Sequence, residues 1–130
     1  MIFAICFIEM TNSVVKVLNH LYEHVNVYHT VIVTESYSET PLLLQVLDEH
    51  DFTVHSVTED DFNCIKDIEK RYRVFIVHQG DFEGYVQAKG WSLNDITLIV
   101  TTTKNAYDSV HDYISGHSCL KDPLYLICAT

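Results

Sequence analysis

The chain opens with Ile2-Phe3-Ala4-Ile5-Cys6-Phe7-Ile8, seven apolar residues in succession. An apolar run without polar alternation, rich in β-branched and aromatic residues, is typical of a strand that is buried on both faces. Such strands lie inside parallel sheets that helices cover above and below. We therefore expect residues 2–8 to form the central strand of a parallel sheet.

Five further strand-like segments follow at intervals, and helical patterns separate them. The predicted strands after the first are 31–33, 52–57, 74–77, 96–100 and 124–128. Apolar residues recur at helical spacing within 14–25, 42–47, 62–72, 82–86 and 106–114. Six strands alternating with five helices predict a single α/β domain over residues 1–130, a doubly wound three-layer α/β/α domain of the Rossmann-like or flavodoxin-like kind.

The order of the strands in this sheet depends on the segment 52–57, which alternates apolar and polar residues for most of its length. Alternation means that one face of the strand contacts water, which favours a place at the edge of the sheet. The order 3-2-1-4-5-6 puts this strand at an edge, whereas the order 2-1-3-4-5 would bury Thr53 and His55. We therefore prefer 3-2-1-4-5-6, with the first strand between the second and the fourth.

Polar residues follow the predicted strands at the places where open α/β sheets bind ligands, beyond the carboxyl ends of the strands where the order reverses. In the preferred order this point lies between the first and fourth strands. The candidate ligand-binding residues are Glu9, Thr11, Asn12, Ser13, His78, Gln79, Asp81 and Lys104, and Glu35 and Ser36 lie next to them. They predict a crevice for a small polar ligand or a cation. The alternative is that they are helix caps and turn residues, which use the same residue types.

Catalytic and cofactor motifs give little support for an enzyme. The loop after the first strand has no glycine, and Glu9 would repel a phosphate, so a nucleotide site is not expected. The nucleophile motif G-x-S-x-G is absent. His20, Glu23 and His24 match the zinc pattern H-x-x-E-H, but they lie opposite the apolar face of their helix and have no identifiable third ligand. We therefore expect no metal, no cofactor and no catalytic residues.

The composition limits the partners and the compartment. Eighteen acidic residues against eight lysines and arginines give a formal charge of −10, which argues against nucleic acid and permits a basic protein partner. No segment is long enough to span a membrane. The four cysteines form no C-x-x-C pair, and Cys6 and Cys128 lie in apolar runs. Free buried thiols are typical of a reducing compartment, so we expect a soluble cytoplasmic protein.

Two functional hypotheses follow from the sequence. The first is a non-enzymatic, acidic α/β protein-interaction module, which binds a protein partner that the sequence does not identify. The alternative is a domain that binds a small ligand or a cation in the crevice at the carboxyl ends of the strands, or one lobe of a receptor-like binding protein. Self-association into a homo-oligomer is compatible with either hypothesis.

Overall fold

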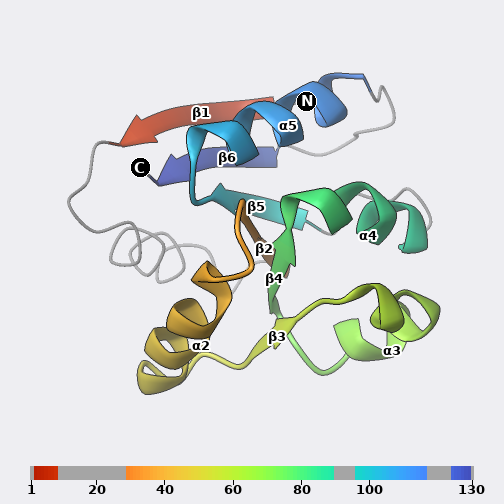
Figure 1. Cartoon of the computed structure of the whole chain (residues 1–130). Helices are drawn as coiled ribbons and strands as arrows, with labels where there is room; N and C mark the ends of the chain where they lie inside the picture. The colour runs from red at the N-terminus through yellow and green to blue at the C-terminus, as the bar shows by residue number, and fades with distance from the viewer. Residues whose placement is uncertain (1, 9–28, 90–95, 117–123, 130) are drawn as a thin grey trace.

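The computed structural model describes residues 2–8, 29–89, 96–116 and 124–129, and these form an α/β fold around one sheet (Figure 1). Its six strands are β1 (Ile2–Ile8), β2 (His29–Thr34), β3 (Val54–Ser56), β4 (Val74–His78), β5 (Ile96–Thr101) and β6 (Leu124–Ala129). Every pair of neighbouring strands is parallel. The predicted fold class is therefore confirmed.

The connections between the strands contain the helices that the sequence predicts. They are α2 (Glu39–Glu49), α3 (Ile65–Glu69), α4 (Phe82–Ala88) and α5 (Lys104–Ser115), with short 3₁₀ helices η1 (Glu59–Cys64) and η2 (Gln79–Asp81). The helix expected within 14–25, with the H-x-x-E-H residues His20, Glu23 and His24, lies outside the described residues. Among the residues described, no helix is long and apolar enough to cross a membrane.

The strand order is β1-β6-β5-β2-β4-β3, and the predicted order 3-2-1-4-5-6 is wrong in two respects. It places β1 between β2 and β4, and it pairs β3 with β2, whereas β3 pairs with β4 and β2 lies between β4 and β5. β1 lies at an edge and pairs with β6 from Ile2 to Ile8, while β5 and β2 occupy the centre. The reason is that an apolar run requires both faces of a strand to be covered, and this does not require a strand on each side. The prediction that the alternating segment 52–57 forms an edge strand is confirmed, since β3 lies at the edge opposite β1.

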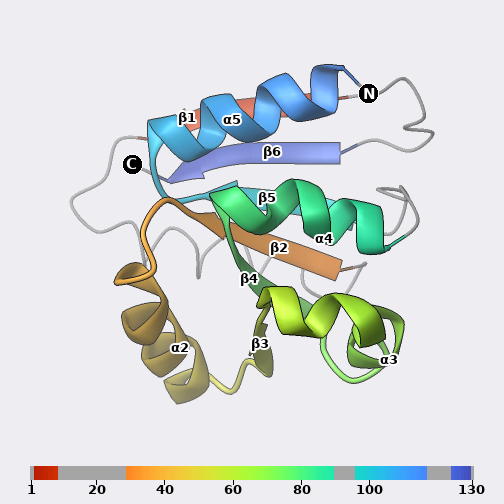
Figure 2. The ribbon, with the colours of Figure 1, turned by 45° about the vertical axis from the view of Figure 1, so that its right-hand side comes forward.

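Side chains on successive strand residues alternate between two apolar cores, one on each face of the sheet. Val31 and Val33 of β2 pack in one core with residues of α4 and α5, while Ile32 between them packs in the other core with residues of α2. Figure 2 shows α4 and α5 together on one face of the sheet. β4, β5 and β6 alternate in the same way. Both faces of the described part of the sheet therefore pack against helices. Thr34 and Thr101, which end β2 and β5, are fully buried, whereas His78 at the end of β4 is partly exposed.

Candidate functional site

The carboxyl ends of β5, β2 and β4 lie beside one another because these strands are neighbours in the sheet. Each end is followed directly by polar residues: Glu35 to Ser38 after β2, η2 after β4, and Thr102 to Asn105 after β5. Parallel strands bring such residues to one edge of a sheet, where α/β domains usually bind their ligands. This edge is therefore the candidate functional site.

His78, the last residue of β4, lies at the candidate site, and both of its ring nitrogens make hydrogen bonds. Its Nε2 lies 2.8 Å from the carbonyl oxygen of Glu35, and its Nδ1 accepts a hydrogen bond of 3.1 Å from the Gly80 N–H. A carbonyl only accepts and an amide N–H only donates, so these contacts select the tautomer with hydrogen on Nε2. His78 thereby links the end of β2 to η2.

Tyr37 projects from the loop after β2 and rests on His78. The two rings are stacked, with centroids 4.0 Å apart and planes 8° from parallel. The Tyr37 hydroxyl donates a hydrogen bond of 3.2 Å to the Asp81 carboxylate, and 65% of the residue remains exposed. Partial desolvation, together with the charge and hydrogen bond of Asp81, raises the pKa of the Tyr37 phenol. The result is an aromatic ring that is fixed in place and accessible to another molecule.

The remaining polar side chains at this edge bond to one another. Asn105 donates a hydrogen bond of 2.9 Å to the Glu35 carboxylate, and hydrogen bonds from Asn105 and Thr103 lower the pKa of Glu35. The hydroxyl of Thr102 donates to the Glu39 carboxylate at the start of α2. Thr103 caps α5 by accepting a hydrogen bond from the Ala106 N–H. These contacts hold the ends of β2 and β5 together and keep Glu35 ionised.

The structure places four of the eight predicted ligand-binding residues at this edge. His78 and Asp81 both contact Tyr37, Gln79 begins η2, and Lys104 begins α5 at the same edge. Glu9, Thr11, Asn12 and Ser13 lie outside the described residues. The predicted switch point between the first and fourth strands is wrong, because β6, β5 and β2 separate β1 from β4.

The residues of the site that were not among the predicted ones include Tyr37, Glu39 and Asn105. Tyr37 could have been noticed as the one aromatic residue in the polar segment Thr34-Glu35-Ser36-Tyr37-Ser38. Asn105 and Glu39 give no such signal, because their roles depend on partners 70 and 63 positions away in sequence. Within the described ranges, no group of three or more metal-ligating side chains comes together.

Comparison with known proteins identifies the fold and no family. No family model matches the chain, and no curated protein is significantly similar to it in sequence. Among solved structures, the crystal structure of the C-terminal part of the Fun30 ATPase domain is similar, with a TM-score of 0.61 and 13% identity. The match covers 92% of this chain and 41% of that one, so the chain spans about two fifths of the length of the structure it resembles. At this identity the likeness concerns the fold alone.

Proposed function

We propose that the chain is a non-enzymatic, acidic protein-interaction domain, and that it contacts a partner through the Tyr37 surface. By this name we mean the Tyr37 ring with the carboxylates of Glu35 and Asp81 beside it. The observation that carries the proposal is that a ring stacked on His78 and hydrogen-bonded to Asp81 is still 65% exposed. Tyrosine is enriched at protein interfaces because it offers a large apolar face with a polar tip.

The hydrogen bonds at this edge favour a contact surface over a catalytic centre. A catalytic base has to reach a proton on the substrate or on a nucleophile. Here both nitrogens of His78 bond to the backbone, Glu35 accepts from Asn105, and Glu39 accepts from Thr102. In the part of this edge that the structure describes, these groups support the position of Tyr37 and one another.

The charge of the Tyr37 surface indicates the chemistry of the partner. Cations are attracted to the face of an aromatic ring, and the carboxylates of Glu35 and Asp81 add to this attraction. We therefore propose that the partner supplies an arginine or lysine side chain.

The proposal is tested by titrating the labelled protein with a blocked tetra-arginine peptide at physiological salt and following its backbone amide signals by NMR. Tyr37→Ala should weaken binding about fivefold, the loss expected when an exposed cation–π contact is removed. Tyr37→Phe should bind almost as the wild type does, because it keeps the ring. Leu42→Ala is the matched control, since Leu42 is also a large apolar residue and is 56% exposed.

Two results would contradict the proposed interaction surface. Equal losses in Tyr37→Ala and Leu42→Ala would mean that the peptide binds through overall charge rather than through the Tyr37 surface. The second result is that argininamide binds as tightly as the peptide and that its binding also depends on Tyr37. This result would favour the alternative function, a domain that binds small cationic ligands.

A further inference from the structure

β3 is the last strand of the sheet, and its outer edge has backbone groups that no described strand pairs. The Val57 N–H donates a hydrogen bond of 2.8 Å to the Ile76 carbonyl, in register with the β3–β4 pairing. Because the direction of the N–H and C=O groups alternates along a strand, those of His55 point toward β4. Those of Val54 and Ser56 point away from the sheet.

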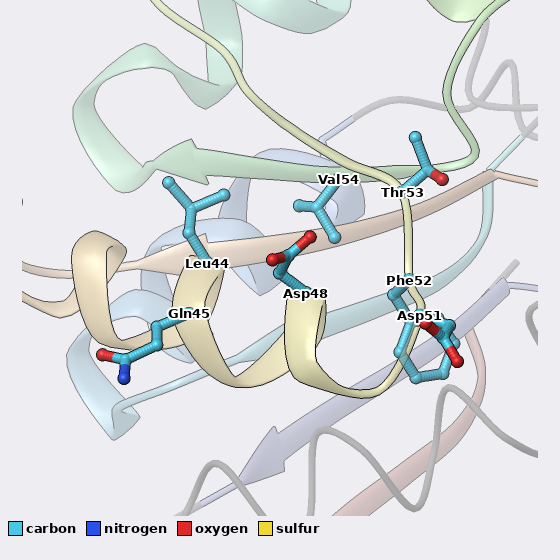
Figure 3. A pocket seen from close by; sticks show the side chains of 7 residues that line it. All are labelled: Leu44, Gln45, Asp48, Asp51, Phe52, Thr53 and Val54. Atoms are coloured by element: carbon cyan, nitrogen blue, oxygen red, sulfur yellow. The ribbon is translucent and has the colours of Figure 1, made fainter.

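A hollow of about 610 Å³ lies beside this edge, between α2 and the segment that leads into β3. We call it the α2 hollow, and its lining residues are Leu44, Gln45, Asp48, Asp51, Phe52, Thr53 and Val54. Figure 3 shows Leu44 and Asp48 extending from α2 toward Val54. The lining of the α2 hollow therefore combines apolar side chains with carboxylates.

A second hollow, of about 370 Å³, adjoins the first and shares the residues 51–53 with it. Its remaining lining residues are Arg71, Arg73 and Val74, so we call it the arginine hollow. Both arginines are exposed. The amino-terminal end of β3 thus carries carboxylates on one side and guanidinium groups on the other.

We propose that the β3 edge binds an extended peptide segment of another protein as an additional strand. One basic side chain of the segment enters the α2 hollow beside Asp48 and Asp51, and an acidic side chain meets Arg71 and Arg73. When a peptide binds as an added strand, main-chain hydrogen bonds supply the affinity, and pockets that receive alternate side chains of the peptide supply the specificity. Since β3 has only three residues, the two hollows must supply much of the selectivity.

A foreign segment fits this edge better than a second copy of the chain does. Each copy carries a formal charge of −10, so two copies repel one another, whereas a segment with a basic residue is attracted to Asp48 and Asp51. The inference goes beyond the proposed function, because it concerns a different surface. The Tyr37 surface lies near the start of α2, and the α2 hollow includes Asp48 near its end.

The test uses the whole chain and a blocked heptapeptide of alternating threonine and valine that carries one lysine and one glutamate. We expect the peptide to shift the amide signals of Val54 and Ser56 and to slow their hydrogen exchange. Ser56→Pro removes an outward N–H without touching the β4 ladder, and proline is tolerated on edge strands. It should weaken binding about fivefold to tenfold, the effect of losing one hydrogen bond, while Ser56→Ala should not weaken it.

A charge reversal keeps the proposal testable if Ser56→Pro fails to fold. Asp48→Lys should weaken binding of the lysine peptide and improve binding of a peptide with glutamate in place of that lysine. Equal binding by Ser56→Pro and Ser56→Ala, or shifts at Tyr37 with none at Val54, would overturn the proposal. Protection of Ser56 that depends on protein concentration without peptide would identify a second copy as the occupant and would overturn it as well.

Discussion

Asp51 has a backbone conformation that aspartate adopts at a cost. Among the described residues other than glycine, it alone has a positive φ, of 63°. It follows the end of α2, where its N–H bonds to the Asp48 carbonyl at 3.0 Å and the Phe52 N–H bonds to the Leu47 carbonyl at 3.0 Å. This pair of bonds is the Schellman motif, whose left-handed position is usually occupied by glycine.

Asp51→Gly should therefore raise the free energy of unfolding by about 0.5–1 kcal/mol, because glycine adopts this conformation without steric cost. The measurement is urea denaturation of the two proteins side by side. Asp51→Asn is the control, since it removes the negative charge and keeps a side chain at Cβ. If Asp51→Asn raised the free energy of unfolding as much as Asp51→Gly did, the gain in stability would come from the loss of charge rather than from the backbone conformation.

Asp61 joins β3 to the start of η1 and makes stability depend on pH. Its Oδ2 accepts hydrogen bonds from the Thr58 N–H at 2.9 Å and lies 3.0 Å from His55 Nε2. Burial by itself raises the pKa of Asp61, but the hydrogen bonds from Thr58 and His55 outweigh it and bring the pKa below its ordinary value of 3.8. The carboxylate therefore stabilises the fold above the ordinary pKa, and this contribution is lost as the pH falls through the lowered value.

Wild-type protein should accordingly lose stability more steeply than Asp61→Asn between about pH 5 and pH 3. Asparagine can still accept the Thr58 hydrogen bond, so the variant keeps the cap and lacks the titrating group. Urea denaturation at several pH values measures both slopes. Parallel slopes for the two proteins would show that Asp61 does not contribute to the acid sensitivity.

At the scale of elements, a buried ion pair connects the last residue of α3 to the residue after α4. Lys89 Nζ lies 2.6 Å from the Glu69 carboxylate, and the two side chains are 1% and 13% exposed. The Tyr85 hydroxyl also donates to Glu69, at 3.5 Å. Removing one partner of such a pair leaves a buried charge uncompensated, whereas replacing both with apolar groups is often neutral or stabilising.

Lys89→Met should thus lower the free energy of unfolding by about 3–5 kcal/mol, and the double variant Lys89→Met, Glu69→Met should recover most of the loss. Lys70 and Asp67 offer a matched exposed pair, with 3.8 Å between nitrogen and oxygen and side chains 78% and 75% exposed. Lys70→Met should change stability by less than about 1 kcal/mol. If the single variant Lys89→Met and the double variant lost the same stability, the loss could not be explained by an uncompensated buried charge on Glu69.

The positions of the elements could be predicted from the sequence more fully than their arrangement. The apolar runs 31–33, 74–77 and 96–100 lie within β2, β4 and β5, because burial on both faces leaves a local pattern. The alternation of apolar and polar residues in 52–57 is also a local pattern, and it correctly predicted that β3 lies at an edge of the sheet. The position of β1 depends on the choice of β6 as its partner, about 120 residues away, and no local pattern encodes that choice.

At the scale of the whole molecule, the candidate site was predictable only where it follows directly from a strand end. His78 and Asp81 come just after an apolar run, so their place at the carboxyl edge of the sheet could be inferred. The role of Tyr37 could not be inferred from the sequence, because it depends on stacking against His78, which is 41 positions away. The pairing of β2 with β4 brings the two residues together. Pairing between strands thus decides which polar residues meet.

Net charge is the property of the whole molecule that gives the last prediction. The formal charge is −10, and protonation of all eight histidines would bring it to −2. Histidine ordinarily titrates near pH 6.5, while most carboxylates stay ionised down to about pH 5. Repulsion between copies should therefore decrease between about pH 7.5 and pH 5.5, and association of the chain with itself should increase.

Sedimentation velocity at low salt, over a series of protein concentrations, measures this change. We expect the weight-average sedimentation coefficient to rise more steeply with concentration at pH 5.5 than at pH 7.5. About 0.5 M salt should reduce the difference, because it shortens the Debye length to only a few ångströms and screens the repulsion at both pH values. Identical sedimentation at the two pH values at low salt would contradict the prediction, since histidine is the side chain that ordinarily changes charge in this interval.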